Sequence, residues 1–357
     1  MDIFSHPDFD QHELLAFRDD PATGLRAIIA VHNSNLGPAT GGCRMYPYVN
    51  NQDALRDVLR LSRGMTYKSA LAGIALGGGK SVIIGNPQQF KTRELMLSMG
   101  EFIESQNGNY ISAEDSGTSV SDMAIIAERT AYVSGLSDDP EHGGDPSPTT
   151  AYGVYKGIAS AVEFKLGSDL QGVRVALQGI GSVGYYLAQY LRDAGAIVFA
   201  ADVNRRNIDR AVNDLGVIEL ALDKVLNADV DVLAPCAMGG AINENTIDHV
   251  QASVIAGAAN NQLATVAMGD ALLEKGILYA PDYVINAGGI IDVFYQQKGN
   301  RSAQMVKEHV DRIGDTLTSI FQRSEQESSA TSHIADVMAE EIFKKPMNKT
   351  NSDTRAA

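Results

Sequence analysis

The segment 63–81 joins two lysines to three consecutive glycines, a combination that suits acid–base chemistry. It reads RGMTYKSALAGIALGGGKS and contains Lys68 and Lys80. Two lysines that meet in one cleft disfavour each other's charge, and partial desolvation favours the neutral amine that a general base needs. The lysine that stays charged could hold a substrate carboxylate. Taken alone, the segment is equally compatible with a flexible glycine loop that carries surface lysines.

The Gly-Lys-Ser sequence at the end of this segment is not a P-loop. That motif has a glycine six residues before its lysine, where Ile74 stands here, and it leads into a helix. Residues 81–84 read SVII and predict a short buried strand instead. A nucleoside triphosphatase is therefore excluded.

A carboxylate stands at the end of another predicted strand. Residues 110–113 are rich in β-forming side chains, and Asp115 follows them in the sequence AEDSGT. Side chains at strand ends face a cleft in many α/β sites, which makes Asp115 a candidate for proton transfer. The alternative, which stays open, is that Asp115 caps a turn or a helix.

The sequence gives no support to several other chemistries. The seven histidines lack a paired i, i+4 spacing, and Cys43 and Cys236 form no Cys-x-x-Cys, so no metal site is expected. No Gly-x-Ser-x-Gly nucleophile motif occurs. The formal net charge of −15 opposes binding to nucleic acid.

A glycine-rich turn in the second half of the chain predicts a dinucleotide site. Residues 173–184 read VRVALQGIGSVG, a strand that runs into Gly-x-Gly-x-x-Gly and a helix. Gly179 permits the tight turn, Gly181 lets a pyrophosphate approach the backbone, and Gly184 lets the helix pack closely on the strand. The helix N-terminus adds free N–H groups and partial positive charge. The residues expected to bind the cofactor here are Gly179, Ile180, Gly181, Ser182, Val183 and Gly184.

An acid at the end of the next predicted strand indicates which dinucleotide is bound. Residues 197–201 lead to Asp202, about 20 residues after the fingerprint, where the ribose-binding acid is expected. Its carboxylate accepts hydrogen bonds from a ribose 2′-hydroxyl and repels a 2′-phosphate, which favours NAD over NADP. Arg205 and Arg206 leave NADP open, because an arginine can accommodate that phosphate.

A chain of 357 residues would arrange these elements in two domains. The first, residues 1–145, mixes strand and helix signals. Residues 136–148 (LSDDPEHGGDPSP) cannot continue a regular element and mark its end, after which Thr150 starts a connecting helix. The strands expected in the first domain are 25–31, 81–84 and 110–113, with helices capped by Asn51 and Thr92.

The second domain, residues 146–325, is a run of βα units, which predicts an α/β fold with a parallel sheet covered on both sides. A C-terminal helical segment, 326–344, and a polar, disordered tail, 345–357, are expected to follow. The expected strands are 173–177, 197–201, 230–234, 253–256 and 277–280, and the helical stretches are centred on 305–321 and 335–343.

Seven motifs carry a resemblance to a known family. They are LGPATGGCRM (36–45), RGMTYKSALAG (63–73), LGGGKSVIIG (76–85), AEDSGTSVSDM (113–123), SPTTAYGVY (147–155), GAANNQL (257–263) and YAPDYVINAGG (279–289). In these the sequence closely resembles the glutamate/leucine/phenylalanine/valine family of amino-acid dehydrogenases, and within it the leucine-specific members. The resemblance extends from about residue 3 to about residue 343.

The resemblance implies a role for each candidate residue. Lys80 would be the catalytic lysine that assists the attack of water on an imine, Lys68 would pair with the substrate carboxylate, and Asp115 would handle protons at the amino group. Further matches are Gly41, Met65 and Asn261 at the substrate and Thr150 and Asn260 at the cofactor.

The resemblance also implies the class of substrate. The lysine and serine that hold the distal carboxylate in glutamate enzymes are matched by Thr40 and Val293, so glutamate is not expected. Ala113 and Ile290 resemble the aliphatic-specific members, whereas Thr40 departs from the leucine typical of leucine-specific ones. We therefore expect L-leucine and the other branched-chain L-amino acids, with phenylalanine or another aromatic amino acid as the alternative.

The family fold implies a first domain with a mixed sheet that also mediates oligomerisation, a doubly wound Rossmann domain, and an active site in the cleft between them. Segment 326–344 would pack back on the first domain, and the protein would be a homo-oligomer, from dimer to octamer. A regulator that binds NAD without turnover is a rival that the Lys68, Lys80 and Asp115 trio disfavours. The acidic start, short apolar stretches and two cysteines predict no leader, no membrane span and a cytoplasmic protein.

Overall fold

The chain forms two compact units in a computed structural model. Unit 1 comprises Met1–Gly143 together with Ala339–Ala357, and unit 2 comprises Gly144–Met338, so the division falls inside helix α12 (Thr331–Phe343). The predicted tail, 345–357, and most of the predicted loop 136–148 lie outside the described residues. The structure describes residues 3–136, 145–237, 239–297 and 302–344.

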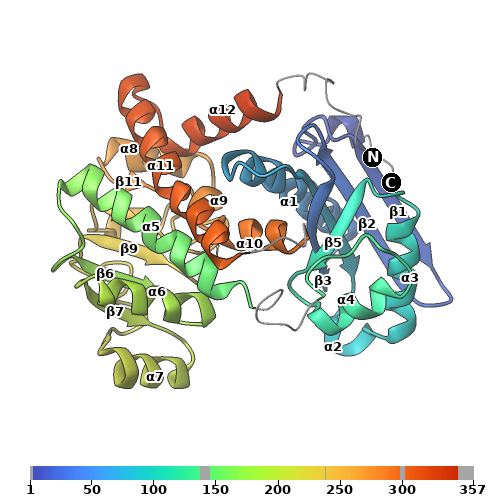
Figure 1. The fold of residues 1–357 in the computed structure, drawn as a ribbon, viewed down its shortest axis with the longest axis horizontal. Coiled ribbons are helices and arrows are strands. Elements are labelled where there is room, and N and C mark those ends of the chain that lie inside the picture. The colour runs from blue at the N-terminus through green and yellow to red at the C-terminus, as the bar shows by residue number, and fades with distance from the viewer. Residues whose placement is uncertain (1–2, 137–144, 238, 298–301, 345–357) are drawn as a thin grey trace. The chain divides into compact units, whose positions relative to one another are not determined.

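Unit 1 is built on a five-stranded mixed sheet in the order β1-β2-β4-β3-β5 (Figure 1). β2 runs antiparallel to β1 and β4, whereas β3 runs parallel to β4 and β5. The mixed sheet confirms what the resemblance implied. The strands are β1 (Leu14–Asp20), β2 (Leu25–Asn33), β3 (Ala39–Tyr46), β4 (Gly77–Ile84) and β5 (Tyr110–Glu114).

Alternating side chains of β2 supply two separate cores. Ile28 and Ala30 pack with Leu55 and Leu59 of α1, whereas Ile29 packs among residues of α3. This alternation follows from the two-residue period of a strand, and it lets helices cover both faces of the sheet. The helices and turns of unit 1 before α12 are η1 (Ile3–Ser5), α1 (Asn51–Leu71), α2 (Pro87–Phe90), α3 (Arg93–Glu104) and α4 (Val120–Ala127).

The three glycines before Lys80 belong to strand β4, which begins four residues earlier than the sequence predicts. A Cβ on Gly78 would lie 2.0 Å from Thr66 Oγ1 in α1, and one on Gly79 would lie 2.7 Å from Cδ2 of Tyr110. The glycines therefore let a helix and an aromatic ring pack directly on the strand. The flexible glycine loop considered above is wrong.

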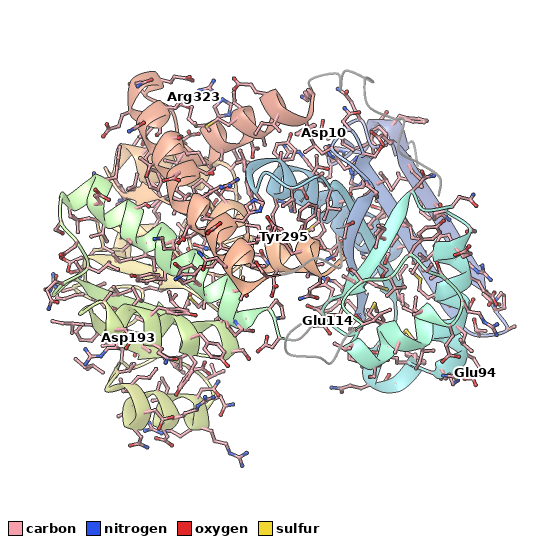
Figure 2. All side chains as sticks on the ribbon, viewed as in Figure 1. Asp10, Glu94, Glu114, Asp193, Tyr295 and Arg323 are labelled. Carbon is pink, nitrogen blue, oxygen red and sulfur yellow. The ribbon has the colours of Figure 1, made fainter. Side chains whose placement is uncertain are left out.

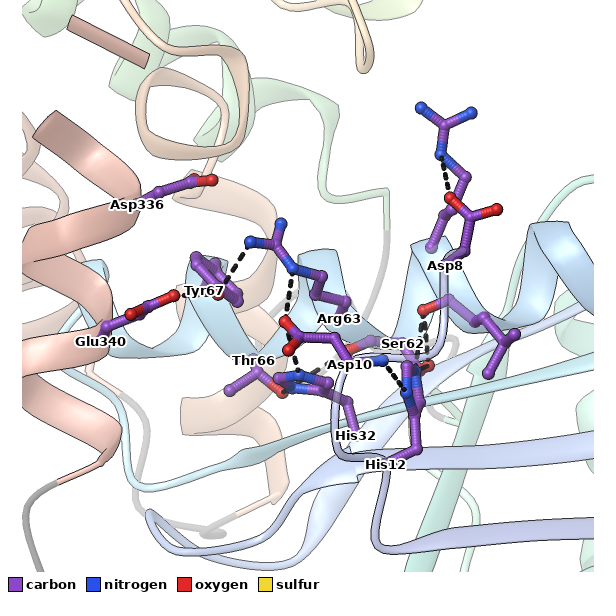
Figure 3. A network of polar contacts seen from close by, with 12 residues as sticks. Asp8, Asp10, His12, His32, Ser62, Arg63, Thr66, Tyr67, Asp336 and Glu340 are labelled. Carbon is purple, nitrogen blue, oxygen red and sulfur yellow. Dashed lines mark hydrogen bonds and ion pairs between the residues drawn. The ribbon is translucent and has the colours of Figure 1, made fainter. Parts of the chain in front are cut away.

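A network of polar contacts (Figure 3), joined by ring contacts of Phe343, holds α1 to β2 and to the end of α12 within unit 1. His32 Nδ1 lies 2.8 Å from Thr66 Oγ1, and the Tyr67 hydroxyl donates to Glu340 at 2.8 Å. The Phe343 ring contacts the rings of His32 and Tyr67, with centroids 5.9 and 5.2 Å apart. The helix that carries Lys68 is thereby held at Thr66 and Tyr67, the two residues before it.

Unit 2 is built on a six-stranded parallel sheet in the order β11-β10-β9-β6-β7-β8 (Figure 1). With the mixed sheet of unit 1, it confirms the predicted two-domain α/β fold. The strands are β6 (Arg174–Gln178), β7 (Ile197–Ala201), β8 (Ile218–Glu219), β9 (Val232–Pro235), β10 (Val254–Ile255) and β11 (Leu278–Tyr279).

The helices of unit 2 include the connecting helix that was predicted to start at Thr150. This helix begins three residues before the predicted start. α5 starts at Ser147, with Pro148 in its first turn, where the missing proline N–H costs no hydrogen bond. None of the helices in the described part of the chain combines the length and the apolar character needed to cross a bilayer. The helices are α5 (Ser147–Leu166), α6 (Ser182–Asp193), α7 (Arg205–Leu215), η2 (Ile247–His249), α8 (Ala267–Glu274), α9 (Asp282–Ile285), α10 (Gly288–Gln297) and α11 (Ala303–Glu327).

Candidate active site

Lys80 and Asp115 meet in unit 1. Lys80 lies within β4 with 6% of its surface exposed, and its Nζ is 2.7 Å from Oδ2 of Asp115. Because strand side chains alternate, Lys80 points to the same face as Gly78, the face that α1 covers. A lysine and a carboxylate at this distance form a pair that can exchange protons with a bound group.

The strand register brings Asp115 to this position. Ala113 of β5 pairs with Gly42 of β3, and Asp115 follows two residues later. A Cβ on Gly42 would lie 2.6 Å from Cβ of Asp115, so only a glycine leaves room for this approach. Thr118 Oγ1 accepts from the Asp115 backbone N–H and donates to the Cys43 carbonyl, which ties the loop to β3.

The charge state of Asp115 is set by two cations. Burial raises the pKa of its carboxyl, but Lys80 and then Arg44 outweigh this effect, so the pKa lies below its ordinary value. Arg44 Nε donates to Oδ2 of Asp115 at 3.0 Å. The neighbouring carboxylate, Glu114, labelled in Figure 2, is exposed.

Arg44 was not identified as a site residue from the sequence. It stands in the motif LGPATGGCRM, but it is 71 residues from Asp115 and gives no local sign of that contact. The signal that could have found it is periodicity, because Arg44 is two residues beyond Gly42 on the same strand and so shares its face.

The other substrate residues predicted in unit 1 lie on α1 and β3. Met65 and Lys68 are half-buried on α1, one turn apart. Gly41 packs so closely on β4 that a Cβ would lie 1.7 Å from the Gly79 carbonyl oxygen. Thr40 is 2% exposed, and its hydroxyl donates to the Pro38 carbonyl at 3.4 Å.

The glycine turn of unit 2 has the shape that a dinucleotide requires. Gly179 has φ of +97°, which favours glycine, and a Cβ on Gly184 would lie 2.5 Å from the Gly179 carbonyl oxygen. At Gly181, the N-cap of α6, a Cβ would meet no atom within 4 Å. Ser182 is exposed beside it and Val183 is half-buried. The backbone at this helix N-terminus is thus open to a phosphate.

Asp202 is linked directly to this turn. Its Oδ2 accepts from the Ile180 N–H at 2.8 Å, and its Oδ1 accepts from the Asn204 N–H at 2.7 Å. The nearby Arg205 is engaged elsewhere, since it donates to Asp209 and Glu219 at 2.6–2.8 Å.

The remaining predicted residues lie in loops and helix starts of unit 2. Asn260 and Asn261 are exposed, whereas the next residue, Gln262, is fully buried and donates to the carbonyls of Gly257 and Ala259. Asn261 adopts φ of +53°, a left-handed conformation that asparagine tolerates better than most side chains.

The two helix starts that carry Thr150 and Ile290 pack on each other. A Cβ on Gly289 would lie 2.8 Å from Thr150 Oγ1, and Thr149 donates to Asp292 at 3.2 Å. Ile290 and Val293 are both half-buried on α10. Thr150 itself donates to the Pro146 carbonyl at 2.9 Å.

The thiols, imidazoles and carboxylates form no metal-binding cluster in the described part of the chain. There, no three His, Cys, Asp or Glu side chains lie close enough to hold a metal ion. Cys43 and Cys236 are free, and burial raises the pKa of each thiol to about 12.

Comparison with known proteins gives concordant matches. A model described as Glu/Leu/Phe/Val dehydrogenase, dimerisation domain, matches residues 13–132, and one described as Glutamate/Leucine/Phenylalanine/Valine dehydrogenase matches residues 203–345. The chain is 45% identical to leucine dehydrogenase of Bacillus subtilis (strain 168) over 342 residues, covering 96% of this chain and 94% of that protein.

Two further relatives have other named substrates. Phenylalanine dehydrogenase of Caldalkalibacillus thermarum (strain TA2.A1) is 41% identical over 351 residues, covering 97% of this chain and 95% of that protein. The crystal structure of L-tryptophan dehydrogenase from Nostoc punctiforme superposes with a TM-score of 0.82 at 40% identity, covering 94% of this chain and 96% of that one.

Proposed function

The chain belongs to the glutamate/leucine/phenylalanine/valine dehydrogenase family and is an amino-acid dehydrogenase, and on this premise we propose that it catalyses the reversible, NAD-dependent oxidative deamination of L-leucine and the other branched-chain L-amino acids. The products are a 2-oxo acid and ammonia. The observation that carries the proposal is the 2.7 Å contact between Lys80 Nζ and Asp115 Oδ2, because deamination needs a base and a proton carrier side by side.

Unit 1 supplies the groups that bind and deprotonate the amino acid. Lys68 holds the substrate α-carboxylate by its charge, and Gly41 and Met65 line the bound molecule. Asp115, held as a carboxylate, takes a proton from the substrate ammonium group and leaves the neutral amine. Loss of the Cα hydrogen as hydride then gives an iminium group.

Hydrolysis of that group uses the same pair. Lys80, as the neutral amine, takes a proton from water while the water oxygen bonds to the iminium carbon. Asp115 returns its proton to the nitrogen of the resulting carbinolamine. The C–N bond then breaks and ammonia leaves while the hydroxyl proton passes to Asp115, which is again a carboxylate, and the carbon becomes the carbonyl of the 2-oxo acid. In the reverse direction the same two groups carry out reductive amination.

The residues of unit 2 fit NAD. The open backbone at Gly181 and the start of α6 would hold the pyrophosphate, Asp202 would hold the ribose, and Thr150 and Asn260 would lie at the nicotinamide end. NAD, when bound, supplies the acceptor for the hydride that leaves the substrate.

The contacts around Asp202 support NAD over NADP. Arg205 is paired with two acids, and this engages one of the two guanidinium groups that could accommodate a 2′-phosphate. Asp202 also fixes the glycine turn through the Ile180 N–H, so a phosphate beside it would meet a carboxylate that cannot move away without breaking this bond.

The side-chain positions support an aliphatic substrate. Thr40, Ala113, Ile290 and Val293 offer no cation for a distal carboxylate, and Ala113 with β-branched Ile290 resembles the aliphatic-specific members of the family. A single methylene is worth only about 1–3 kcal/mol of discrimination, so leucine, isoleucine and valine should all react. An aromatic amino acid is the second candidate because relatives at 40–41% identity are named phenylalanine and L-tryptophan dehydrogenase.

The test is NADH formation at alkaline pH with five amino acids in parallel: leucine, valine, isoleucine, phenylalanine and glutamate. Each is assayed with NAD and then with NADP. Highest kcat/KM for the branched aliphatics with NAD supports the whole proposal. A lead for phenylalanine keeps the reaction and overturns the interpretation of the pocket, and no turnover with any of them leaves an NAD-binding regulator.

Assembly and compartment are part of the same proposal. Unit 1 contains the segment matched by a dimerisation-domain model, which supports a homo-oligomer. Both cysteines are free thiols, which is in keeping with the reducing cytoplasm. Light scattering of the purified protein tests the first point.

A further inference from the structure

We propose that Arg44, held in place by Asp57 and Tyr48, is a positioning residue that fixes the Asp115 carboxylate and favours the neutral form of Lys80. The inference rests on the proposed roles of Lys80 and Asp115. It assigns a task to three residues that the reaction scheme above does not use.

The guanidinium of Arg44 spans two carboxylates from different elements. Its Nε donates to Oδ2 of Asp115 at 3.0 Å, and its Nη1 donates to Oδ2 of Asp57 on α1 at 3.0 Å. The Asp115 oxygen that accepts from Arg44 is the same one that contacts Lys80 Nζ at 2.7 Å. The guanidinium, itself held by Asp57, therefore keeps Oδ2 of Asp115 in place beside Lys80 Nζ.

A tyrosine completes the chain of contacts. The Tyr48 hydroxyl donates to Oδ2 of Asp57 at 2.5 Å. Burial and then this hydrogen bond raise the pKa of Tyr48, so the hydroxyl remains a donor. Asp57 is thereby held between Tyr48 and Arg44, and the order of contacts is Tyr48, Asp57, Arg44, Asp115 and Lys80.

Charges of opposite sign alternate from Asp57 through Arg44 and Asp115 to Lys80, and this alternation gives Arg44 its role. When Lys80 becomes the neutral base, Asp115 loses one cationic partner. Arg44 keeps its charge: burial lowers its pKa, but Asp115 and Asp57 outweigh burial and raise it above the ordinary value. The remaining positive charge stabilises the Asp115 carboxylate and favours release of the proton from Lys80, whereas the negative charge of Asp57 offsets part of this effect.

Other titratable groups near Asp115 do not compete for this role. Cys43 on β3 is a buried thiol whose pKa burial raises to about 12, so it stays neutral. Asp122 on α4 is paired with Lys91 at 2.7 Å. Glu114 is exposed to solvent.

The experiment measures the pH dependence of kcat and KM for leucine, together with KM for NAD, in the full-length protein and three variants. Arg44→Met removes the charge, Arg44→Lys keeps it without the planar fork, and Asp57→Asn removes the opposing charge while keeping a side chain of the same shape. Arg18→Met is the matched control, since Arg18 pairs with Glu101 on the surface of the same unit at 3.2 Å.

The inference predicts shifts of opposite sign. Arg44→Met should move the acidic limb of the kcat profile to higher pH by about one unit and lower kcat, with KM for NAD unchanged. Asp57→Asn should move the limb to lower pH, because the Arg44 charge is then less compensated. Arg44→Lys should return the limb close to the wild-type position while kcat stays reduced, and Arg18→Met should change neither.

A second readout separates this inference from the proposed function. Labelling with acetic anhydride, followed by peptide mass spectrometry, gives the pH at which Lys80 becomes reactive without any turnover. A midpoint that rises in Arg44→Met and falls in Asp57→Asn supports the inference even if no amino acid is oxidised. An unchanged midpoint in both variants overturns it even if the wild type is an active dehydrogenase. Arg44→Lys and Asp57→Asn keep the test valid if Arg44→Met does not fold.

Discussion

At the scale of single residues, the contact between Lys80 and Asp115 joins two groups with opposite requirements. A base works only as the neutral amine, and its neighbour is useful as a proton acceptor only while it is ionised. Burial of Lys80 to 6% exposure makes this balance sensitive to each nearby charge. Substitution of the lysine is the most direct test of the proposed chemistry.

Lys80→Ala should lower kcat by about 10³-fold, within the 10²–10⁴ range that general bases contribute. NAD binding should be unchanged, because the residues proposed to bind NAD belong to unit 2. The measurements are initial rates with leucine and an NADH fluorescence titration. Lys165→Ala, an exposed lysine of α5, is the control. Near wild-type turnover in Lys80→Ala would remove Lys80 from the mechanism.

Asp202 combines a charge with a hydrogen bond to the glycine turn, and the two can be separated. Asp202→Asn keeps an oxygen that accepts from the Ile180 N–H but removes the charge. The ratio of kcat/KM for NAD over NADP should fall by on the order of tenfold, since a hydrogen bond to a charged group is worth about 1.5–3 kcal/mol. Asp202→Ala should lower the same ratio and also weaken NADH binding. An unchanged ratio in both variants would exclude Asp202 from the ribose site.

At the scale of elements, the glycines of β4 set how closely α1 can approach the sheet. Gly78→Ala would place a Cβ 2.0 Å from Thr66 Oγ1 and 2.3 Å from the Thr66 backbone nitrogen. A rotation of the Thr66 side chain cannot relieve the second contact, so helix and strand would have to move apart. We expect a loss of about 1–3 kcal/mol of unfolding free energy, measured by urea denaturation. Gly64→Ala on α1, where a Cβ meets no atom within 4 Å, should instead be neutral or stabilising by up to ~1 kcal/mol. Equal effects of the two substitutions would contradict this account.

The sequence predicts regular elements well where one local pattern decides them. Strand β7 has the predicted bounds, and Thr92 accepts from the Leu95 N–H at 3.2 Å as the helix cap it was predicted to be. The extension of β4 through Gly77–Gly79 could not be predicted, because glycine disfavours strands locally and only distant neighbours such as Thr66 and Tyr110 require it here.

The contact network on α1 also makes stability depend on pH. His32 is 4% exposed, and burial lowers its pKa from 6.5 to about 4. Between these values the unfolded chain binds more protons than the folded one. The stability that neutral His32 contributes is therefore complete above about pH 6.5 and is lost as the pH falls toward 4.

We expect the wild type to lose about 2 kcal/mol of unfolding free energy from His32 between pH 6.5 and pH 5. His32→Gln should be less stable at pH 7 but should show a flatter dependence across this range. His249→Gln, an exposed histidine of unit 2, should behave as the wild type does. Urea denaturation at pH 7, 6 and 5 measures all three proteins, and parallel curves for His32→Gln and the wild type would refute the assignment.

At the scale of the whole molecule, the predictable part of the site is what the motifs contain. Lys68, Lys80 and Asp115 stand in sequences that resemble a known family. Arg44 also stands in one of these motifs and shares a strand face with Gly42, but its contact with Asp57 joins β3 to α1, and no spacing along the chain predicts that contact. The resemblance, and no local signal, implied that segment 326–344 packs back on the first domain, whereas the structure groups the chain with unit 1 only from Ala339.

That return predicts a specific effect of Phe343. Phe343→Ala should cost about 3 kcal/mol, because the ring is 2% exposed among the rings of His32 and Tyr67. Hydrogen exchange should become faster in β2 and α1 and stay unchanged in β7 of unit 2. Ile342→Ala, on a side chain 39% exposed, should leave exchange unaltered in both units. Faster exchange confined to unit 2 would be incompatible with this packing.

The hydrogen bond from Tyr67 to Glu340 joins residues 273 positions apart, and this has a consequence for the order of events during synthesis. A ribosome adding about 10 residues per second needs roughly half a minute to pass from one to the other. Throughout that interval all of unit 2 is made while unit 1 still lacks its last packing residues. Unit 1, which carries Lys80 and Asp115, therefore begins to emerge first and is completed last.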